Sequence, residues 1–197
     1  MTVSNLHLSS YGMRRSQSTA EDLVDRLVKG DPQAVGEVYD LYHHAVRAFA
    51  TRLVGDPAAA EDLVHDVFVA LPRAARRFKG QSTLRSFLIG IAINHARHHV
   101  RSASRRRAAM DRLAHQPASK GTDPEQELGR EQLALALTRA LDSLPLAQRA
   151  VFVLCEVEER SSVEAARIVG VPEGTIRSRL HHAKRKLRAA LAREGIR

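Results

Sequence analysis

The chain has few aromatic residues and a single cysteine. Aromatic residues make up 4% of its 197 residues and there is no Trp, which argues against a protein that binds single strands mainly by stacking bases on rings. With Cys155 alone, an intramolecular disulfide and a multi-cysteine zinc site are excluded. Cys155 lies on the apolar side of an expected helix with Val151 and Leu154, so we interpret it as a buried, unreactive thiol.

Long apolar runs and catalytic motifs are also missing. Residues 1–19 are polar and lack the apolar segment of a secretory signal, and no run has the length of a transmembrane helix. We therefore expect a cytoplasmic protein without a membrane partner. There is no G-x-S-x-G, no Walker lysine loop and no nucleophile–base pair, so we expect no enzyme, no cofactor and no small-molecule substrate.

Positive charge is present in excess. The formal net charge of +9 indicates a polyanionic partner, either nucleic acid or anionic lipid. A lipid surface is disfavoured because no amphipathic segment carries bulky apolar anchors. Residues 173–197 contain eight Lys or Arg and two Glu, and thus hold six of the nine net positive charges.

Apolar residues recur at three- and four-residue spacing, and no segment alternates as a strand would. Two Gly-Asp-Pro sequences, at 30–32 and 55–57, each predict an Asp N-cap with Pro in the first helical turn. The sequence therefore predicts an all-α protein with two small helical domains joined by a flexible linker. We assign a disordered tail to 1–18, the first domain to 19–101, the linker to 102–122 and the second domain to 123–197.

Residues 161–191 are typical of a helix-turn-helix. Ser161 and Glu164 have capping-box spacing, and the sequence at 170–172, Gly-Val-Pro, ends the first helix. The second helix, from Glu173, has one apolar stripe. Its opposite face carries Arg177, Ser178, His181, His182, Arg185 and Arg188. Such a face suits the major groove of DNA, although a surface helix with a solvated basic face has the same pattern.

The first domain contains an acidic segment and a basic helix flank. Between Asp56 and Asp66 there are four acids and no Lys or Arg, and Asp62 lies one helical turn from Asp66. These acids either serve solubility, which the charges alone favour, or dock a basic protein. Further along, one helix flank carries Asn94, Arg97, His98 and Arg101, residue types that contact bases and phosphates. Two DNA surfaces on one tether would gain affinity from each other.

A metal site is a third possibility for the basic helix. His95 and His99 are four residues apart, but Ala96 stands where a zincin has Glu, and no nearby acid supplies a third ligand. We predict no metal site.

Residues 30–101 resemble region two of bacterial extracytoplasmic-function sigma factors, within the sigma-70 superfamily. The matching segments are V-Y-D-L-Y at 38–42, G-D-P-A-A-A-E-D-L-V-H-D-V-F at 55–68 and S-T-L-R-S-F-L-I-G-I-A-I-N-H-A at 82–96. Residues 141–191 resemble region four through L-P-L-A-Q-R-A-V-F-V-L at 144–154, E-A-A at 164–166 and V-P-E-G-T-I-R-S-R-L-H-H-A at 171–183.

The resemblance implies a role for each surface. The acidic helix would dock on the largest clamp subunit of RNA polymerase through Asp62, Val64, His65, Asp66 and Phe68. The minus-ten element would be captured and melted by Lys79, Ser82, Thr83, Asn94, Arg97, His98 and Arg101. The minus-thirty-five element would be read by Arg177, Ser178, His181 and His182, with Arg179, Lys184 and Arg185 on phosphates. The linker would thread toward the polymerase active-site channel.

The resemblance thus implies an alternative sigma factor that takes core RNA polymerase, through its clamp and flap, to promoter DNA. It also implies an anti-sigma factor and a place in the bacterial cytoplasm, at the nucleoid when active. A stand-alone helix-turn-helix repressor that dimerises on palindromes is the alternative. Three departures from the family pattern stand out: Phe87 in place of Trp, Glu158-Glu159-Arg160 in place of a glycine-containing turn, and the His98-His99 pair.

Overall fold

In the computed structural model, residues 20–78, 80, 82–113 and 136–195 are described, and these contain helices and no strand. The first domain consists of α1 (Ala20–Val28), α2 (Pro32–Val54), α3 (Pro57–Ala75) and α4 (Leu84–Leu113). In the second domain, helical residues 136–142 precede α6 (Leu146–Phe152), the π-helix η1 (Val153–Val157), α7 (Ser162–Val169) and α8 (Glu173–Arg193). The all-α prediction is confirmed. The predicted tail at 1–18 lies outside the described residues.

The two Gly-Asp-Pro sequences position the helices of the first domain. Asp31 caps α2 by accepting a hydrogen bond from the backbone N–H of Gln33 at 2.9 Å, and Asp56 caps α3 by accepting one from Ala59 at 2.7 Å. Gly55 ends α2 in the left-handed conformation, with φ +73°, and its N–H donates to the Thr51 carbonyl at 2.7 Å. Because only glycine adopts this φ without strain, one tripeptide both ends α2 and begins α3.

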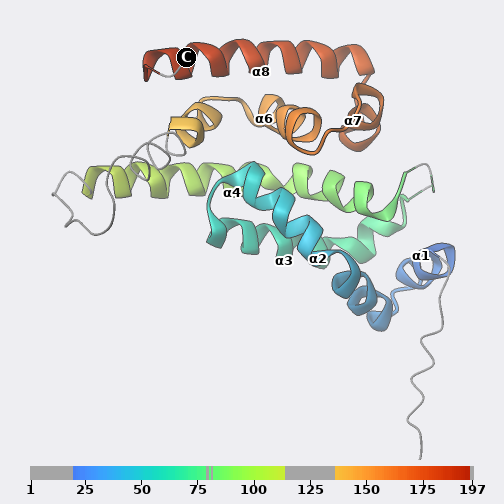
Figure 1. The fold of residues 1–197 in the computed structure, drawn as a ribbon. Coiled ribbons are helices and arrows are strands. Elements are labelled where there is room, and N and C mark those ends of the chain that lie inside the picture. Colours follow the sequence, from blue (N-terminus) through green and yellow to red (C-terminus); the bar gives the residue numbers. More distant parts are fainter. Residues whose placement is uncertain (1–19, 79, 81, 114–135, 196–197) are drawn as a thin grey trace, which may run out of the picture.

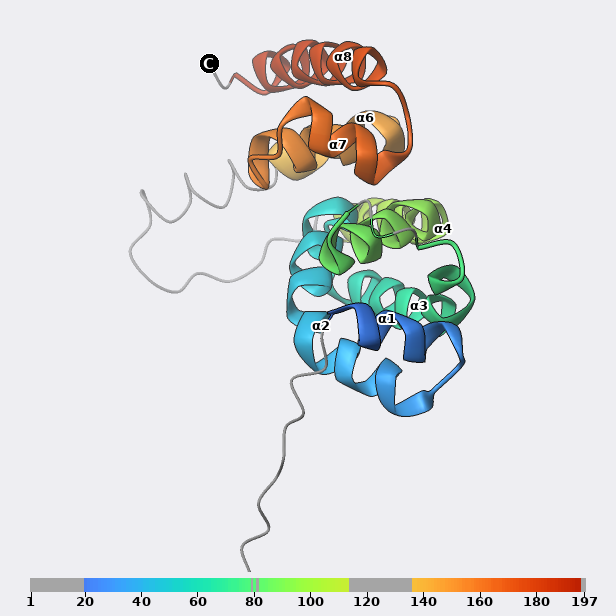
Figure 2. The ribbon, with the colours of Figure 1, turned by 90° about the vertical axis from the view of Figure 1, so that its right-hand side faces the viewer.

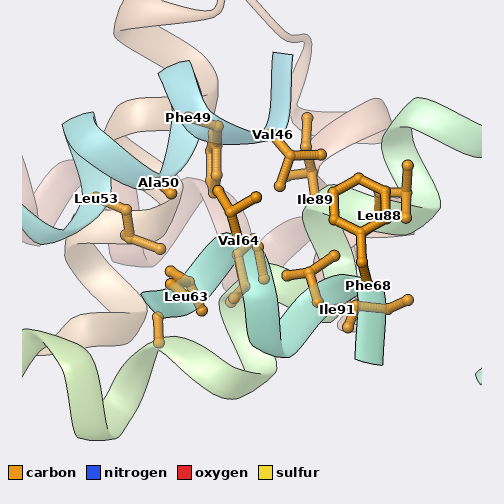
Figure 3. Close-up of a cluster of buried hydrophobic side chains, with 14 of the residues drawn as sticks. Val46, Phe49, Ala50, Leu53, Leu63, Val64, Phe68, Leu88, Ile89 and Ile91 are labelled. Atoms are coloured by element: carbon orange, nitrogen blue, oxygen red, sulfur yellow. The ribbon is translucent and has the colours of Figure 1, made fainter. Parts of the chain in front are cut away.

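The core of the first domain lies between α2, α3 and α4 (Figure 3). Phe49 and Leu53 of α2, Leu63 of α3 and Leu88 of α4 have no exposed surface. Burial of each such side chain contributes roughly 1.5–3 kcal/mol relative to exposure. These residues recur at the helical spacing of the sequence, so the burial follows from the pattern.

Helix α4 is longer than the sequence predicts. It continues to Leu113, whereas we placed the end of the domain at 101 and a linker at 102–122. The linker prediction is wrong over 102–113, because Ala103 is fully buried and Arg107 is half-buried in an ion pair, so the arginine-rich segment has packing contacts of its own. Arginine is also a good helix former. The remainder of the predicted linker, 114–122, lies outside the described residues.

The two domains pack against each other. Figures 1 and 2 show α6 and α7 lying between α8 on one side and α4 on the other. Val151, Leu154 and Ile176 of the second domain belong to the same buried cluster as Leu53 and Leu88 of the first. A second, smaller cluster, formed by Ala140, Leu144, Ala183 and Leu187, lies under α8.

Candidate nucleic-acid and protein interfaces

The helix-turn-helix is capped as the sequence predicts. The Ser161 hydroxyl oxygen accepts a hydrogen bond from the Glu164 N–H at 3.2 Å, and the Glu164 carboxylate accepts one from the Ser161 N–H at 2.9 Å. A further bond from the Ser161 hydroxyl, at 2.8 Å, and the backbone bond hold the pKa of Glu164 below its usual range. Gly170 ends α7 with φ +72°. The capping box and the glycine C-cap are confirmed.

Helix α8 has a buried stripe and a polar outer face. Ile176 and Ala183 are fully buried and Leu187 is nearly so. Of the residues assigned to the minus-thirty-five element, Arg177, Ser178, His181 and Arg185 are exposed, whereas Arg179, His182 and Lys184 are half-buried. At 3.6 residues per turn the four exposed side chains fall on one side of the helix, so they form a continuous surface opposite the core.

Several cations of α8 already have partners. Arg177 is paired with Glu173 one turn earlier, with 2.6 Å between Nη2 and Oε1, and Arg185 Nη2 lies 3.3 Å from His182 Nδ1. Both contacts are exposed, and an exposed pair contributes little stability, so either cation can be redirected at low cost. Lys184 differs, because its Nζ lies 2.8 Å from Glu156 of η1 and it lines an apolar groove.

The residues assigned to the minus-ten element lie at the start and along one flank of α4. The Thr83 hydroxyl oxygen accepts a hydrogen bond from the Ser86 N–H at 3.2 Å, so Thr83 caps this helix. Asn94, Arg97 and Arg101 are exposed, and their spacing of three and four residues puts them on one flank. Lys79 lies outside the described residues.

A hollow of about 480 Å³ opens beside the start of α4. Ser82 and Thr83 line it together with the rings of Tyr42 and Phe78. Neither ring is assigned to this site by the sequence, although both are aromatic residues in a chain that has few. The loop before α4 and helix α2 thus place two hydroxyls and two rings around one open space.

His98 lies on the acidic side of α4. It lines a hollow of about 280 Å³ with Asp62, His65 and Asp66 of α3. The neighbouring His99 is 8% exposed, and its Nε2 lies 2.8 Å from the Asp66 carboxylate. This pair links α3 to α4 and was not predicted, because the two residues are 33 positions apart in the sequence.

The residues assigned to polymerase docking divide into two groups. Asp62 and His65 are exposed and Asp66 is half-buried. Asp62 has no hydrogen-bond or ion-pair partner among the residues that the structure describes. Val64 and Phe68 are 4% and 7% exposed and belong to the core (Figure 3). Their side chains pack between the helices, so in this structure they support the docking helix from inside, and their own contact with a partner stays a prediction.

Tyr39 and His43 extend the surface beside α3. The Tyr39 ring is 43% exposed, stacks on His43 with 4.7 Å between ring centroids, and meets Phe68 edge-on at 4.8 Å. The four-residue spacing of Tyr39 and His43 is a signal that could have found this contact from the sequence.

Cys155 is half-buried in η1 rather than buried as predicted, and burial raises the pKa of its thiol. Within the described ranges, no group of three or more His, Cys, Asp or Glu side chains is arranged to hold a metal ion. Nor does any helix in the described part of the chain combine the length and apolarity needed to cross a membrane.

Comparisons with known proteins match both domains. The family described as Sigma-70 region 2 matches residues 38–106, and the family described as Sigma-70, region 4 matches residues 134–187. The RNA polymerase sigma-H factor of Pseudomonas aeruginosa is 29% identical over 184 residues, which cover 89% of this chain and 95% of that protein. The ECF RNA polymerase sigma-E factor of Escherichia coli strain K12 is 31% identical over 178 residues, which cover 85% and 92%.

Two solved structures are also similar. One is CnrH in complex with the cytosolic domain of CnrY, with a TM-score of 0.55 and 28% identity over 88% of this chain and 97% of that one. The other is the sigma factor RpoE in complex with the anti-sigma factor NepR from Bartonella quintana, with a TM-score of 0.50 and 27% identity over 80% and 96%.

Proposed function

This chain belongs to the extracytoplasmic-function group of the sigma-70 family, and on that premise we propose how its surfaces recognise a promoter and a polymerase. It is an alternative sigma factor, a DNA-binding transcription initiation factor that takes core RNA polymerase to specific promoters. The repressor alternative is wrong, because residues 38–106 match sigma region 2 and the full-length relatives are sigma factors.

We assign recognition of the minus-thirty-five element to the exposed face of α8. Arg177, Ser178 and His181 lie in its first turns, opposite a stripe that is buried against the rest of the domain. A helix held in this way can enter the major groove and offer donors to base edges. Half-buried His182 flanks this face, and we assign phosphate contacts to Arg179 and Arg185, with Lys184 joining them where it leaves Glu156.

For the minus-ten element we assign the hollow between α1, α2 and the start of α4. Tyr42 and Phe78 offer ring faces on which one unpaired base can stack, and Ser82 and Thr83 offer hydroxyls to its edge. Asn94, Arg97 and Arg101 continue the surface along α4. We assign a phosphate contact to Lys79 because it precedes Ser82 and Thr83 in the sequence. His98 lies beside the acids of α3, so we assign it a DNA contact at the edge of this surface.

Polymerase docking is assigned to two surfaces. We assign contact with the largest clamp subunit to three polar side chains of α3, namely Asp62, His65 and Asp66. The physical reason is that the two carboxylates complement the charge of a basic partner. A groove of about 430 Å³ under α8, lined by apolar side chains that include Leu141, Phe152 and Leu187, receives the flap.

We also assign the remaining partners and the place of action. The protein makes no covalent chemistry of its own and leaves RNA synthesis to the polymerase. Because a similar structure is that of a sigma factor with its anti-sigma factor, an anti-sigma factor would mask these surfaces. The protein would act in the bacterial cytoplasm, at the nucleoid.

A binding assay tests the docking surface. Purified core RNA polymerase is titrated with the wild-type protein and with the Asp62→Lys/Asp66→Lys variant. We expect complex formation with the wild type and its loss in the variant, because reversed charges repel a basic clamp surface. The Asp25→Lys/Glu159→Lys variant makes the same change in net charge outside α3 and is the control. Equal binding by all three proteins would contradict the assignment.

A further inference from the structure

The second domain covers part of the surface that we assign to the minus-ten element. Ser82 and Asn94 of the first domain share a hollow of about 280 Å³ with Arg167 and Ile168 of α7. A Cβ placed on Gly90 would lie only 3.0 Å from the Ile168 carbonyl oxygen. The backbone of α7 therefore rests directly on α4, one turn before Asn94, and DNA approaching this side of α4 meets α7 first.

The Glu158 carboxylate holds the domains together at this point. It follows η1, and its side chain is 7% exposed. One carboxylate oxygen lies 2.9 Å from Arg85 Nη2 of α4, and the other accepts a hydrogen bond from Arg52 of α2. A single carboxylate from the second domain thus binds two guanidinium groups of the first, in the segment where this chain departs from the glycine-containing turn of its family.

Arg85 would be a DNA contact if Glu158 were absent. It lies two residues after Thr83, at the start of the helix that we assign to the minus-ten element. Its side chain is 37% exposed, and its buried Nε has no hydrogen-bond partner in the part of the chain that the structure describes. A guanidinium in this position binds a phosphate as readily as a carboxylate. A DNA phosphate would therefore have to compete with the Glu158 carboxylate for this guanidinium.

We propose that the packed form is autoinhibited, with Glu158 as an intramolecular competitor that denies Arg85 to the DNA backbone. When the domains separate, Arg85 becomes a phosphate contact beside the minus-ten surface, and α7 leaves that surface at the same time. The outer face of α8 is exposed in the packed form, so the closed state engages Arg85 and covers the hollow beside Asn94 while it leaves the minus-thirty-five side open. This inference rests on the function proposed for α4.

Glu158→Gln tests the competitor without altering its shape. Glu159→Gln removes the same charge from the exposed neighbouring side chain and is the matched control. The first measurement is the radius of gyration of each full-length protein by small-angle X-ray scattering. We expect a larger radius for Glu158→Gln than for the wild type or the control, because two arginines lose their anion. Equal radii in all three proteins would overturn the proposal.

The second measurement identifies Arg85 as the released cation. A fluorescent single-stranded oligodeoxynucleotide of random sequence is titrated with each protein over a series of salt concentrations. One added phosphate contact steepens the slope of log K against log salt by about 0.7. We expect this gain in Glu158→Gln relative to Glu159→Gln, and its loss when Arg85→Gln is added. Equal slopes, or a gain that survives Arg85→Gln, would contradict the assignment.

Neither measurement contains polymerase, so the competitor and the proposed function fail separately. If Glu158→Gln separates the domains and gains the phosphate contact, Glu158 is a competitor of DNA. This conclusion holds even if Asp62→Lys/Asp66→Lys leaves binding to core polymerase unchanged. Conversely, Glu158→Gln and Glu159→Gln could give the same radius and the same salt slope while the wild-type protein directs polymerase to promoters. That result would support the proposed function and contradict the role of Glu158 as a competitor.

Discussion

At the scale of single residues, Glu159 adopts a conformation that side chains avoid. Its φ is +53°, and it is the one residue other than glycine with positive φ in the described ranges. The family pattern places a glycine in this turn, and the backbone here keeps the form that glycine would adopt. A Cβ in the left-handed region costs roughly 1–2 kcal/mol.

Glu159→Gly is therefore expected to stabilise the protein by up to about 1 kcal/mol, after the greater chain entropy of glycine in the unfolded state is subtracted. The free energy of unfolding in urea measures the effect. Glu159→Ala is the control, since it removes the carboxylate but keeps the Cβ. If both variants change the stability equally, strain at Glu159 is not the cause.

Arg177 is the residue of α8 whose loss should matter most for promoter recognition. Arg177→Ala is expected to weaken binding of the polymerase holoenzyme to its promoter by about 1–3 kcal/mol if the guanidinium makes a bidentate base contact. Competition binding against promoter variants measures the loss and should show relaxed preference at one base pair. Arg193→Ala, at the end of the same helix, controls for charge. Promoter affinity equal to wild type in Arg177→Ala would remove Arg177 from the reading face.

The roles of some single residues could be predicted from the sequence, and those of others could not. Asp31, Asp56 and Ser161 could be assigned as caps because each depends only on neighbours within three residues. Val64 and Phe68 were assigned to a partner by resemblance, and the motif does not say which side of the helix each side chain takes. Their 4% and 7% exposure follows from packing against α2 and α4.

At the scale of elements, the helix-turn-helix depends on the capping box at the start of α7. Ser161→Ala removes the side-chain acceptor for the Glu164 N–H, and loss of a serine cap costs about 1 kcal/mol. Thermal unfolding of wild type and variant at neutral pH measures the difference. Ser178→Ala, on the exposed face of α8, should leave the melting temperature unchanged, and an equal shift in both variants would contradict the role of the cap.

The same capping box predicts a pH dependence. Hydrogen bonds from Ser161 lower the pKa of Glu164 in the folded state. A carboxyl with a lowered folded pKa stabilises the fold above its unfolded pKa, and this contribution is lost as the pH falls through the folded pKa. The difference in melting temperature between wild type and Ser161→Ala should therefore shrink in acid. A difference that stays constant from neutral to acid pH would mean that the Glu164 carboxylate is not involved.

Among the elements, the starts of α2, α3 and α7 could be predicted because their N-caps are encoded in short sequences. The continuation of α4 to Leu113 could not, since the contacts that support Ala103 and Arg107 come from distant parts of the chain. The π-helix at Val153–Val157 was also missed, because apolar spacing over five residues does not distinguish it from an α-helix.

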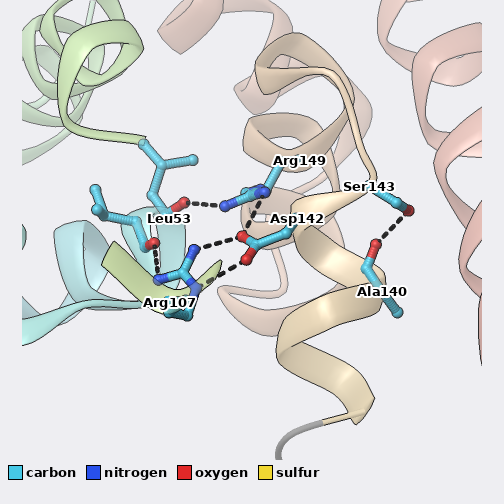
Figure 4. Close-up of polar contacts among 7 residues, drawn as sticks. Leu53, Arg107, Ala140, Asp142, Ser143 and Arg149 are labelled. Atoms are coloured by element: carbon cyan, nitrogen blue, oxygen red, sulfur yellow. Dashed lines mark hydrogen bonds and ion pairs between the residues drawn. The ribbon is translucent and has the colours of Figure 1, made fainter. Parts of the chain in front are cut away.

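At the scale of the whole molecule, a second group of ion pairs joins the domains (Figure 4). Asp142 binds Arg107 of α4 with 2.5 Å between Oδ1 and Nη2, and Arg149 of α6 at 2.9 Å. The same two arginines donate to the Val54 and Leu53 carbonyl oxygens at the end of α2. Arg149 is 2% exposed, and its burial lowers the pKa of the guanidinium, an effect that Asp142 opposes.

Asp142→Asn is expected to destabilise the protein by about 3 kcal/mol, because two arginines would then face each other with no anion, one of them buried. Chemical denaturation of the full chain measures the loss. Asp40→Asn, on an exposed position of α2, should leave the midpoint unchanged. If Asp142→Asn also unfolds at the wild-type midpoint, these ion pairs contribute nothing net to the packed form.

The packing of the two domains against each other could not be predicted from the sequence. Arg85 and Glu158 are 73 positions apart, and Arg52 and Glu158 are 106 apart, so no local pattern records either contact. Glu158-Glu159-Arg160 was recognised as a departure from the family, but only the folded chain reveals that Glu158 faces two arginines.

As a sigma factor, this protein directs core RNA polymerase to specific promoters. The most direct measurement is transcription in vitro with purified core polymerase on a library of genomic promoter fragments, with and without the protein. We predict start sites that appear only with the protein and disappear with Asp62→Lys/Asp66→Lys. The absence of any protein-dependent transcript, together with tight binding of the protein alone to duplex DNA, would contradict the sigma-factor function.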